Sequence, residues 1–179
     1  LWAPFPAFQP LHLRHHSHTN QPGEDPDHWM ATQNPFMVVL RAFTIMVSYY
    51  YHFLARLDAQ KRKKLPELIL NVSVMFAVAA AAGFAWGPAV PLLLWFLPAV
   101  FALAILAIVF DWLPHRPHTS RERYKDTRII LRPGLQTLLL GQNLHLVHHL
   151  YPTVPFYRYG AAYRRVAEFL QAKGASISH

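Results

Sequence analysis

Two long apolar runs near the middle of the chain dominate its pattern of hydrophobic and polar positions. The first, residues 68–86, has Asn71 as its one strongly polar residue, and the second, residues 89–110, is apolar throughout. A helix needs about 20 apolar residues to cross a bilayer core, and both runs roughly meet that length. Neither run contains a charged residue, which argues against a buried hairpin of a soluble protein. The pattern predicts two transmembrane helices joined by a turn at Gly87 and Pro88.

A third apolar segment, residues 36–55, could cross a membrane by length alone. It is interrupted by Arg41, and residues 49–51 are three tyrosines that precede His52. Aromatic rings with polar tips favour the headgroup level of a bilayer. We therefore expect an interfacial helix over residues 36–55, with a spanning helix as the alternative.

The remaining segments are polar, and their charge predicts which side of the membrane they face. Three prolines in residues 1–11 predict that no long helix forms there. A basic connector lies at 56–64, and a second basic region begins after residue 111. Two spans return the chain to the side that it left, so both regions face one compartment, which the positive-inside rule makes the cytoplasm. An amphipathic helix is expected at 160–172.

Composition narrows the classes of protein that remain. The chain has 179 residues, 53% of them hydrophobic and 15% charged, and is short enough for a single domain over residues 1–179. It has no cysteine, which excludes disulfides, iron–sulfur clusters and thiolate zinc sites. Its formal charge of +8 favours an anionic membrane surface or an acidic protein partner over nucleic acid.

One motif, H-x-x-H-H, occurs twice and carries the candidate chemistry. Two matches are far less expected by chance than one, and histidine clusters in membrane proteins are costly and usually functional. Residues three and four apart share a helix face, so we expect each copy to aim three imidazoles at one point. Six imidazoles are too many for one tetrahedral site, which favours a pair of metal ions. The two copies are His12, His15 and His16, and His145, His148 and His149.

A third group of candidate residues ends the second apolar run. His115 is a candidate seventh nitrogen ligand, and we expect His118 at the surface. Asp111 either orients a neighbouring ligand, binds through a water, or is a polar cap at the end of the helix. Near the first motif, Arg14, Asp25 and Asp27 are further candidates for contacts with the ligands.

These motifs resemble the membrane fatty acid desaturase superfamily, whose members carry one H-x(3,4)-H box and two H-x-x-H-H boxes. Within it, D-W-L-P-H-R-P-H and G-Q-N-L-H-L-V-H-H-L-Y-P-T-V-P-F-Y-R-Y are most like the carotenoid ring hydroxylases of cyanobacterial and plant type. The resemblance implies an all-α integral membrane fold, with a transmembrane hairpin, interfacial helices and a cytoplasmic histidine-rich cap. It also implies two iron ions, with the first motif as the middle box, the second motif as the last box, and His115 as an additional ligand.

One departure from the family pattern matters. The first box of the family lies upstream of the middle one, but no histidine precedes His12, and two of the usual four spans are missing. We expect an N-terminally truncated chain that lacks some ligands; a pseudo-enzyme, or a site completed by another chain, are the alternatives.

The expected function is oxygen-dependent oxidation of a membrane lipid, with hydroxylation of a carotenoid ring first and desaturation or hydroxylation of an acyl chain as the alternative. Two other classes rank lower. A zinc hydrolase would favour H-E-x-x-H, which is absent, and a metal transporter would need ionisable residues within its spans.

The resemblance also implies a substrate route and an electron partner. Trp95, Phe96 and Trp112 are candidates to line the substrate route, or else they pack the helices. The basic stretch at 116–132 would attract an acidic electron carrier, a ferredoxin or a protein of the cytochrome b5 type, although positive-inside topology explains the charge equally well.

Overall fold

The computed structural model describes residues 4–179, and most of them are helical. Helix α1 spans Phe5–His18, α2 spans Pro35–Ala55 and α3 spans Ala59–Trp86. A second long helix then runs almost without interruption from Ala89 to His115. Its parts are α4 (Ala89–Pro91), a π-helical turn (Leu92–Phe96), α5 (Leu97–Leu106), a second π-helical turn (Ala107–Trp112) and α6 (Leu113–His115).

The C-terminal part is a small lobe of short elements. Helices α7 (Leu135–Leu138), α8 (His145–Leu150) and α9 (Tyr159–Ala172) surround a parallel pair of strands, β1 (Arg128–Ile130) and β2 (Ser176–Ser178). Single 3-10 turns lie at Pro26–Met30, Gln142–Leu144 and Phe156–Arg158. The expected amphipathic helix at 160–172 is confirmed by α9, whereas the strand pair was not expected from the sequence.

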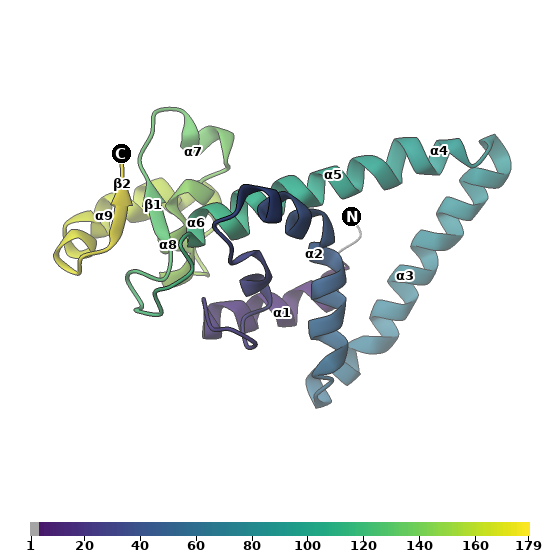
Figure 1. Ribbon diagram of the computed structural model, residues 1–179, viewed down its shortest axis with the longest axis horizontal. Coiled ribbons are helices and arrows are strands. Elements are labelled where there is room, and N and C mark those ends of the chain that lie inside the picture. Colours follow the sequence, from purple (N-terminus) through teal and green to yellow (C-terminus); the bar gives the residue numbers. More distant parts are fainter. Residues whose placement is uncertain (1–3) are drawn as a thin grey trace.

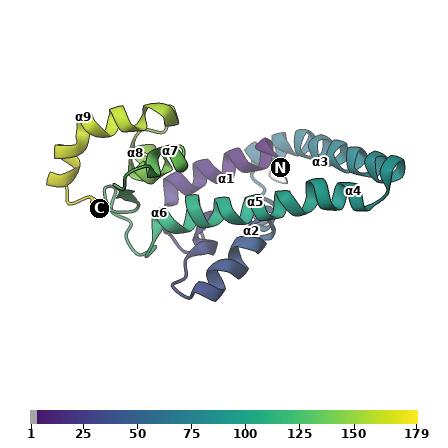
Figure 2. The same ribbon diagram turned by 90° about the horizontal axis from the view of Figure 1, so that it is seen from above.

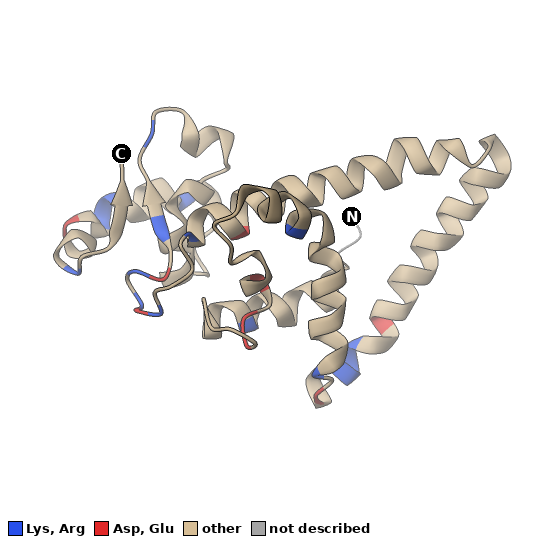
Figure 3. Ribbon diagram, in the orientation of Figure 1, with Lys and Arg blue, Asp and Glu red and all other residues tan. Residues whose placement is uncertain are grey.

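Three helices are long and apolar enough to cross a membrane: α2, α3 and the long helix from Ala89 to His115. The last two diverge from the turn at Gly87, and α2 lies across their separated ends, so that the three form a triangle (Figure 1). Helix α3 starts earlier than the predicted span because Asp58 caps it, its side chain accepting from the backbone N–H of Lys61. Charged residues gather at the wide side of the triangle and in the C-terminal lobe, away from the turn (Figure 3).

The prediction that residues 1–11 form no long helix is wrong for the described part of that segment. Helix α1 begins at Phe5 and runs for 14 residues. Pro4 is the cap and Pro6 lies in the first turn, where backbone N–H groups have no helical partner, so these prolines cost little. Only Pro10 lies inside the helix.

An apolar cluster fixes α1 against the long helices. Ala7 and Leu11 of α1 pack with Phe53 of α2 and Leu68 of α3, and Phe53 is fully buried. In the C-terminal lobe a second cluster, centred on Leu146 and Val147 of α8, packs on β1 and α9. The two clusters hold α1 and α8 in place, and α8 lies beside the C-terminal end of α1 when the molecule is seen from above (Figure 2).

Candidate metal centre

The three segments that carry the candidate ligands lie close together in the structure. The last two turns of α1, the whole of α8 and the end of α6 face one another, and their histidines form two groups that could each hold a metal ion. His12, His16 and His148 make the first, called here the three-histidine group. His15, His115, His145 and His149 make the second, the four-histidine group.

The three-histidine group has the spacing of ligands around a single ion. Its three Nε2 atoms form a triangle with sides of 3.3 Å (His12–His148), 3.1 Å (His12–His16) and 3.0 Å (His16–His148). Two nitrogens that each lie about 2.0–2.1 Å from one metal, at angles between 90° and tetrahedral, are roughly 2.8–3.4 Å apart. The triangle therefore matches three adjacent ligands of one ion.

The four-histidine group is more deeply buried and leaves nitrogen atoms without partners. The Nε2 atoms of His15 and His149 are 3.2 Å apart. Both ring nitrogens of His115 and Nε2 of His145 are buried without a hydrogen-bond partner among residues 4–179. An unsatisfied buried donor or acceptor costs about 1–3 kcal/mol. A metal ion bound by these nitrogens would remove that cost, so the residues present fit the iron that the resemblance implies.

The two motifs are shared between the groups, which differs from the expectation that each copy aims three imidazoles at one point. In both motifs the first and third histidines, four residues apart, stay together, and the middle one joins the other group. The cause is helical geometry: at 3.6 residues per turn, adjacent residues such as His15 and His16 point about 100° apart. Each group therefore needs both α1 and α8.

Hydrogen bonds to the far ring nitrogens orient three of the ligand candidates. Nδ1 of His15 lies 2.8 Å from Oδ1 of Asp25 and 3.3 Å from Oδ2 of Asp27. Contacts of this kind fix the tautomer and the ring orientation of metal-binding histidines. Of the residues flagged near the first motif, Asp25 and Asp27 thus contact a ligand candidate, whereas Arg14 pairs with Glu24.

Two orienting residues were missed in the sequence. Nδ1 of His148 lies 2.8 Å from the hydroxyl of Tyr159, and Nδ1 of His145 lies 3.0 Å from Oε1 of Gln142. Gln142 precedes its histidine by three residues, a spacing that could have been recognised. Tyr159 lies in the next helix, and no local spacing indicates it.

Burial and neighbouring charges set the protonation of the histidines on α1. Burial, together with the nearby histidines, lowers the pKa of His12 and of His16 to about 3, so both rings are neutral, the form that binds metals. Burial also acts to lower the pKa of His15, but the carboxylates of Asp27 and Asp25 outweigh it and raise that pKa to about 9. Metal binding at His15 would therefore displace a proton.

His118 was expected at the surface, and this is wrong. It is buried beside His115 and belongs to neither histidine group. Its backbone N–H donates to the carbonyl of His115 (2.6 Å), and its φ of 65° lies in the left-handed region. The chain therefore turns directly after α6.

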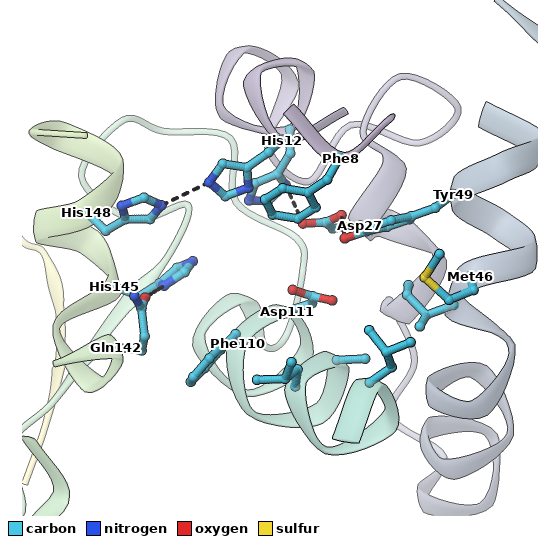
Figure 4. A pocket seen from close by; sticks show the side chains of 15 residues that line it. Phe8, His12, Asp27, Met46, Tyr49, Phe110, Asp111, Gln142, His145 and His148 are labelled. Atoms are coloured by element: carbon cyan, nitrogen blue, oxygen red, sulfur yellow. Dashed lines mark hydrogen bonds and ion pairs between the residues drawn. The ribbon is translucent and has the colours of Figure 1, made fainter. Parts of the chain in front are cut away.

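An apolar cavity of about 370 Å³ opens onto the histidines from the side of the long helices. Its volume falls within the range of small-molecule sites. Four histidines, His12, His15, His145 and His148, form its floor, and Asp111 also faces it (Figure 4). The other lining residues are Phe8, Asp27, Ile45, Met46, Tyr49, Leu103, Leu106, Ala107, Phe110 and Gln142.

The aromatic residues that were candidates for the substrate route do not line this cavity. Trp95 and Phe96 lie further along the long helix towards the turn. Trp112 packs against a cluster of buried residues on α2 and the long helix, and its Nε1 donates to the carbonyl of Thr32 (2.9 Å). For Trp112 the structure supports the alternative, packing.

Together, these elements define an integral membrane protein with buried histidine clusters that could bind metal, beneath an apolar cavity. The model of the fatty acid desaturase family matches residues 1–179, and the chain belongs to that family. The family consists of diiron-dependent membrane enzymes.

A curated relative points in the same direction. The chain is 37% identical over 68 residues to a β-carotene ketolase from Paracoccus sp. (strain N81106 / MBIC 01143), a member of the same superfamily. The match covers 36% of this chain and 28% of the ketolase. No solved structure matches the chain significantly.

Proposed function

We propose that the protein is an oxygen-dependent diiron enzyme that oxidises the ring of a carotenoid, most simply by hydroxylation. The observation that carries the proposal is the position of two histidine groups on the floor of an apolar cavity. The name of the curated relative, a β-carotene ketolase, supports a carotenoid as the substrate. Oxidation of an acyl chain is the second candidate, favoured by the description of the family itself.

Different residues of the chain would have different roles in such a reaction. The four-histidine group would hold one iron and the three-histidine group the other. Bound iron would supply the oxidising chemistry for an unactivated C–H bond, which side chains alone lack. Apolar residues such as Ile45 and Leu106 exclude water and would position the ring over the histidines. The carboxylates of Asp25 and Asp27 keep the ring of His15 directed at its group.

An acidic electron carrier, a ferredoxin or a cytochrome b5-type protein, is the partner that we propose. A second, polar cavity of about 410 Å³ is lined by His16 and His149, neither of which lines the apolar cavity. Arg121 and Arg123 line it, and both are exposed in the structure. Positive charge at such an opening would steer an acidic partner to histidines that do not line the substrate cavity.

Metal analysis of the full-length protein, purified in mild detergent, tests the proposal. We expect about two irons per chain with little zinc. Turnover of carotenoid driven by reduced plant-type ferredoxin should then fall as salt is added, because screening weakens the attraction between the partners. One zinc per chain, or no metal, would overturn the diiron proposal, and conversion of acyl chains but not carotenoids would favour the second candidate.

We propose further that the histidine groups face the cytoplasm and that α2 lies at the interface. The contact between His12 and His148 supports this, since α1 and α8 must share one side of the membrane. The chain has no cysteine, so single cysteines can report topology directly. An impermeant maleimide should reach Ala89→Cys from outside the cell, but Lys63→Cys and Pro22→Cys only after permeabilisation. Labelling of Lys63→Cys or Pro22→Cys in intact cells would contradict the proposed topology.

A further inference from the structure

Asp111 places a carboxyl group in the wall of an otherwise apolar part of the cavity. It lies in the π-helical turn Ala107–Trp112, and its side chain points into the cavity near Phe110 (Figure 4). Turns of this type recur at functional sites because they redirect a side chain out of the regular helical pattern. Asp111 belongs to neither histidine group. Its carboxyl group is therefore not among the direct ligands of either group.

Two other polar side chains of the cavity wall, Tyr49 and Gln142, each make a hydrogen bond within the protein, and the histidines of the wall are candidate metal ligands. The hydroxyl of Tyr49 donates to Oδ1 of Asp27 (2.6 Å), and Oε1 of Gln142 lies 3.0 Å from Nδ1 of His145. Asp111, by contrast, makes no hydrogen bond or ion pair with any of residues 4–179. Asp111 is therefore a polar group of the described cavity wall that is available to an occupant.

An occupant made only of hydrocarbon would be poorly suited to this wall. It would displace water from the carboxyl group of Asp111 and give it no partner, and burying a polar group without a hydrogen bond costs about 1–3 kcal/mol in proteins. Asp27 and Asp25 repel the carboxylate of Asp111 and His15 attracts it, but none of the three forms a hydrogen bond or an ion pair with it. A hydroxyl group on the occupant would relieve that cost, by donating to a carboxyl oxygen of Asp111.

We infer that Asp111 is a specificity-determining residue that binds a hydroxyl group on the ring of the substrate. The cavity would then prefer a ring that already carries oxygen over the unsubstituted hydrocarbon ring. This inference rests on the proposed carotenoid substrate. A site built to hydrogen-bond a substrate hydroxyl discriminates strongly against the analogue that lacks it, because its own polar group is then left unpaired.

Small ring probes test the inference without turnover. The probes are β-ionone and its 3-hydroxy and 4-hydroxy derivatives, and their binding to the iron-loaded protein in detergent is followed by tryptophan fluorescence. We expect at least one hydroxy derivative to bind about tenfold more tightly than β-ionone, equivalent to about 1.4 kcal/mol. Asp111→Leu should abolish that preference. Asp111→Asn should retain part of it, because the amide oxygen still accepts a hydrogen bond.

Met46→Leu is the matched control, since Met46 lines the same cavity and offers no comparable hydrogen-bonding group. It should leave the preference unchanged. Equal affinities for all three probes in the wild-type protein, or an unchanged preference in Asp111→Leu, would overturn the inference. So would a loss of iron from Asp111→Asn, since the carboxylate would then serve the metal centre.

Failure of the inference can be told apart from failure of the proposed function. A protein that contains iron and oxidises acyl chains, yet binds no ring probe, overturns the role of Asp111 and leaves the diiron enzyme in place. A protein without iron overturns the proposed function, whereas a hydroxyl preference that depends on Asp111 would still support the binding role.

Discussion

His148→Ala is expected to lower the iron content from about two ions per chain to one or fewer, and to reduce turnover by about 100-fold or more. His148 closes the triangle of the three-histidine group, with its Nε2 3.0 Å from that of His16 and 3.3 Å from that of His12. Without it, two imidazoles remain at that position. Iron is measured by elemental analysis of the purified variant.

Two further variants test whether the loss of iron is specific to the three-histidine group. His18 lies on the same helix as the first motif but outside both groups, with Nδ1 2.8 Å from the hydroxyl of Ser17, so His18→Ala should keep its iron. His115→Ala should empty the four-histidine group instead. Full iron content in His148→Ala would refute its assignment as a ligand.

Phe53→Ala is expected to destabilise the protein by about 3 kcal/mol or more, the usual cost of truncating a fully buried phenylalanine. Phe53 is 0% exposed and packs with Ala7 and Leu11 of α1. Its loss opens a cavity beneath the helix that carries the first motif. In a chain of this size the midpoint of thermal unfolding should fall by about 10 °C, and iron should be lost at a lower temperature.

Phe84→Ala is the control for that variant. Phe84 is 96% exposed on α3, where a bilayer would cover it. Its truncation leaves no cavity within the protein, so the melting temperature in detergent should change little. Equal destabilisation by the two variants would show that the Phe53 cluster does not hold α1 in place.

Local periodicity was enough to predict the long helices, whereas contacts between distant segments could not be read from the sequence. The apolar runs at 68–86 and 89–110 lie within the two long helices, because length and hydropathy decide such elements almost alone. Helix α1 was not predicted because residues 1–11 contain three prolines. Proline is tolerated at the start of a helix, and Pro4 and Pro6 both lie there. Whether α2 spans or lies at the interface stays a prediction.

The same contrast holds at the candidate site. Both motifs and His115 could be read from spacing, and the structure brings all seven histidines together. How the histidines divide into two groups could not be read in this way, because that division depends on how α1 faces α8. The contacts of His15 with Asp25 and of His148 with Tyr159 likewise depend on loops and helices meeting in space.

Each histidine group takes ligands from both motifs, so a bound metal would hold α1 and α8 together as well as supply chemistry. His12 and His148 are separated by 136 positions in the chain, so an ion held by both closes a loop that includes the whole membrane hairpin. In a chain without cysteine, such an ion would act as a crosslink that limits the unfolded ensemble, as a disulfide does elsewhere. Neither motif can complete its group before α1 and α8 have come together, so metal would bind late in folding and would stabilise the folded arrangement.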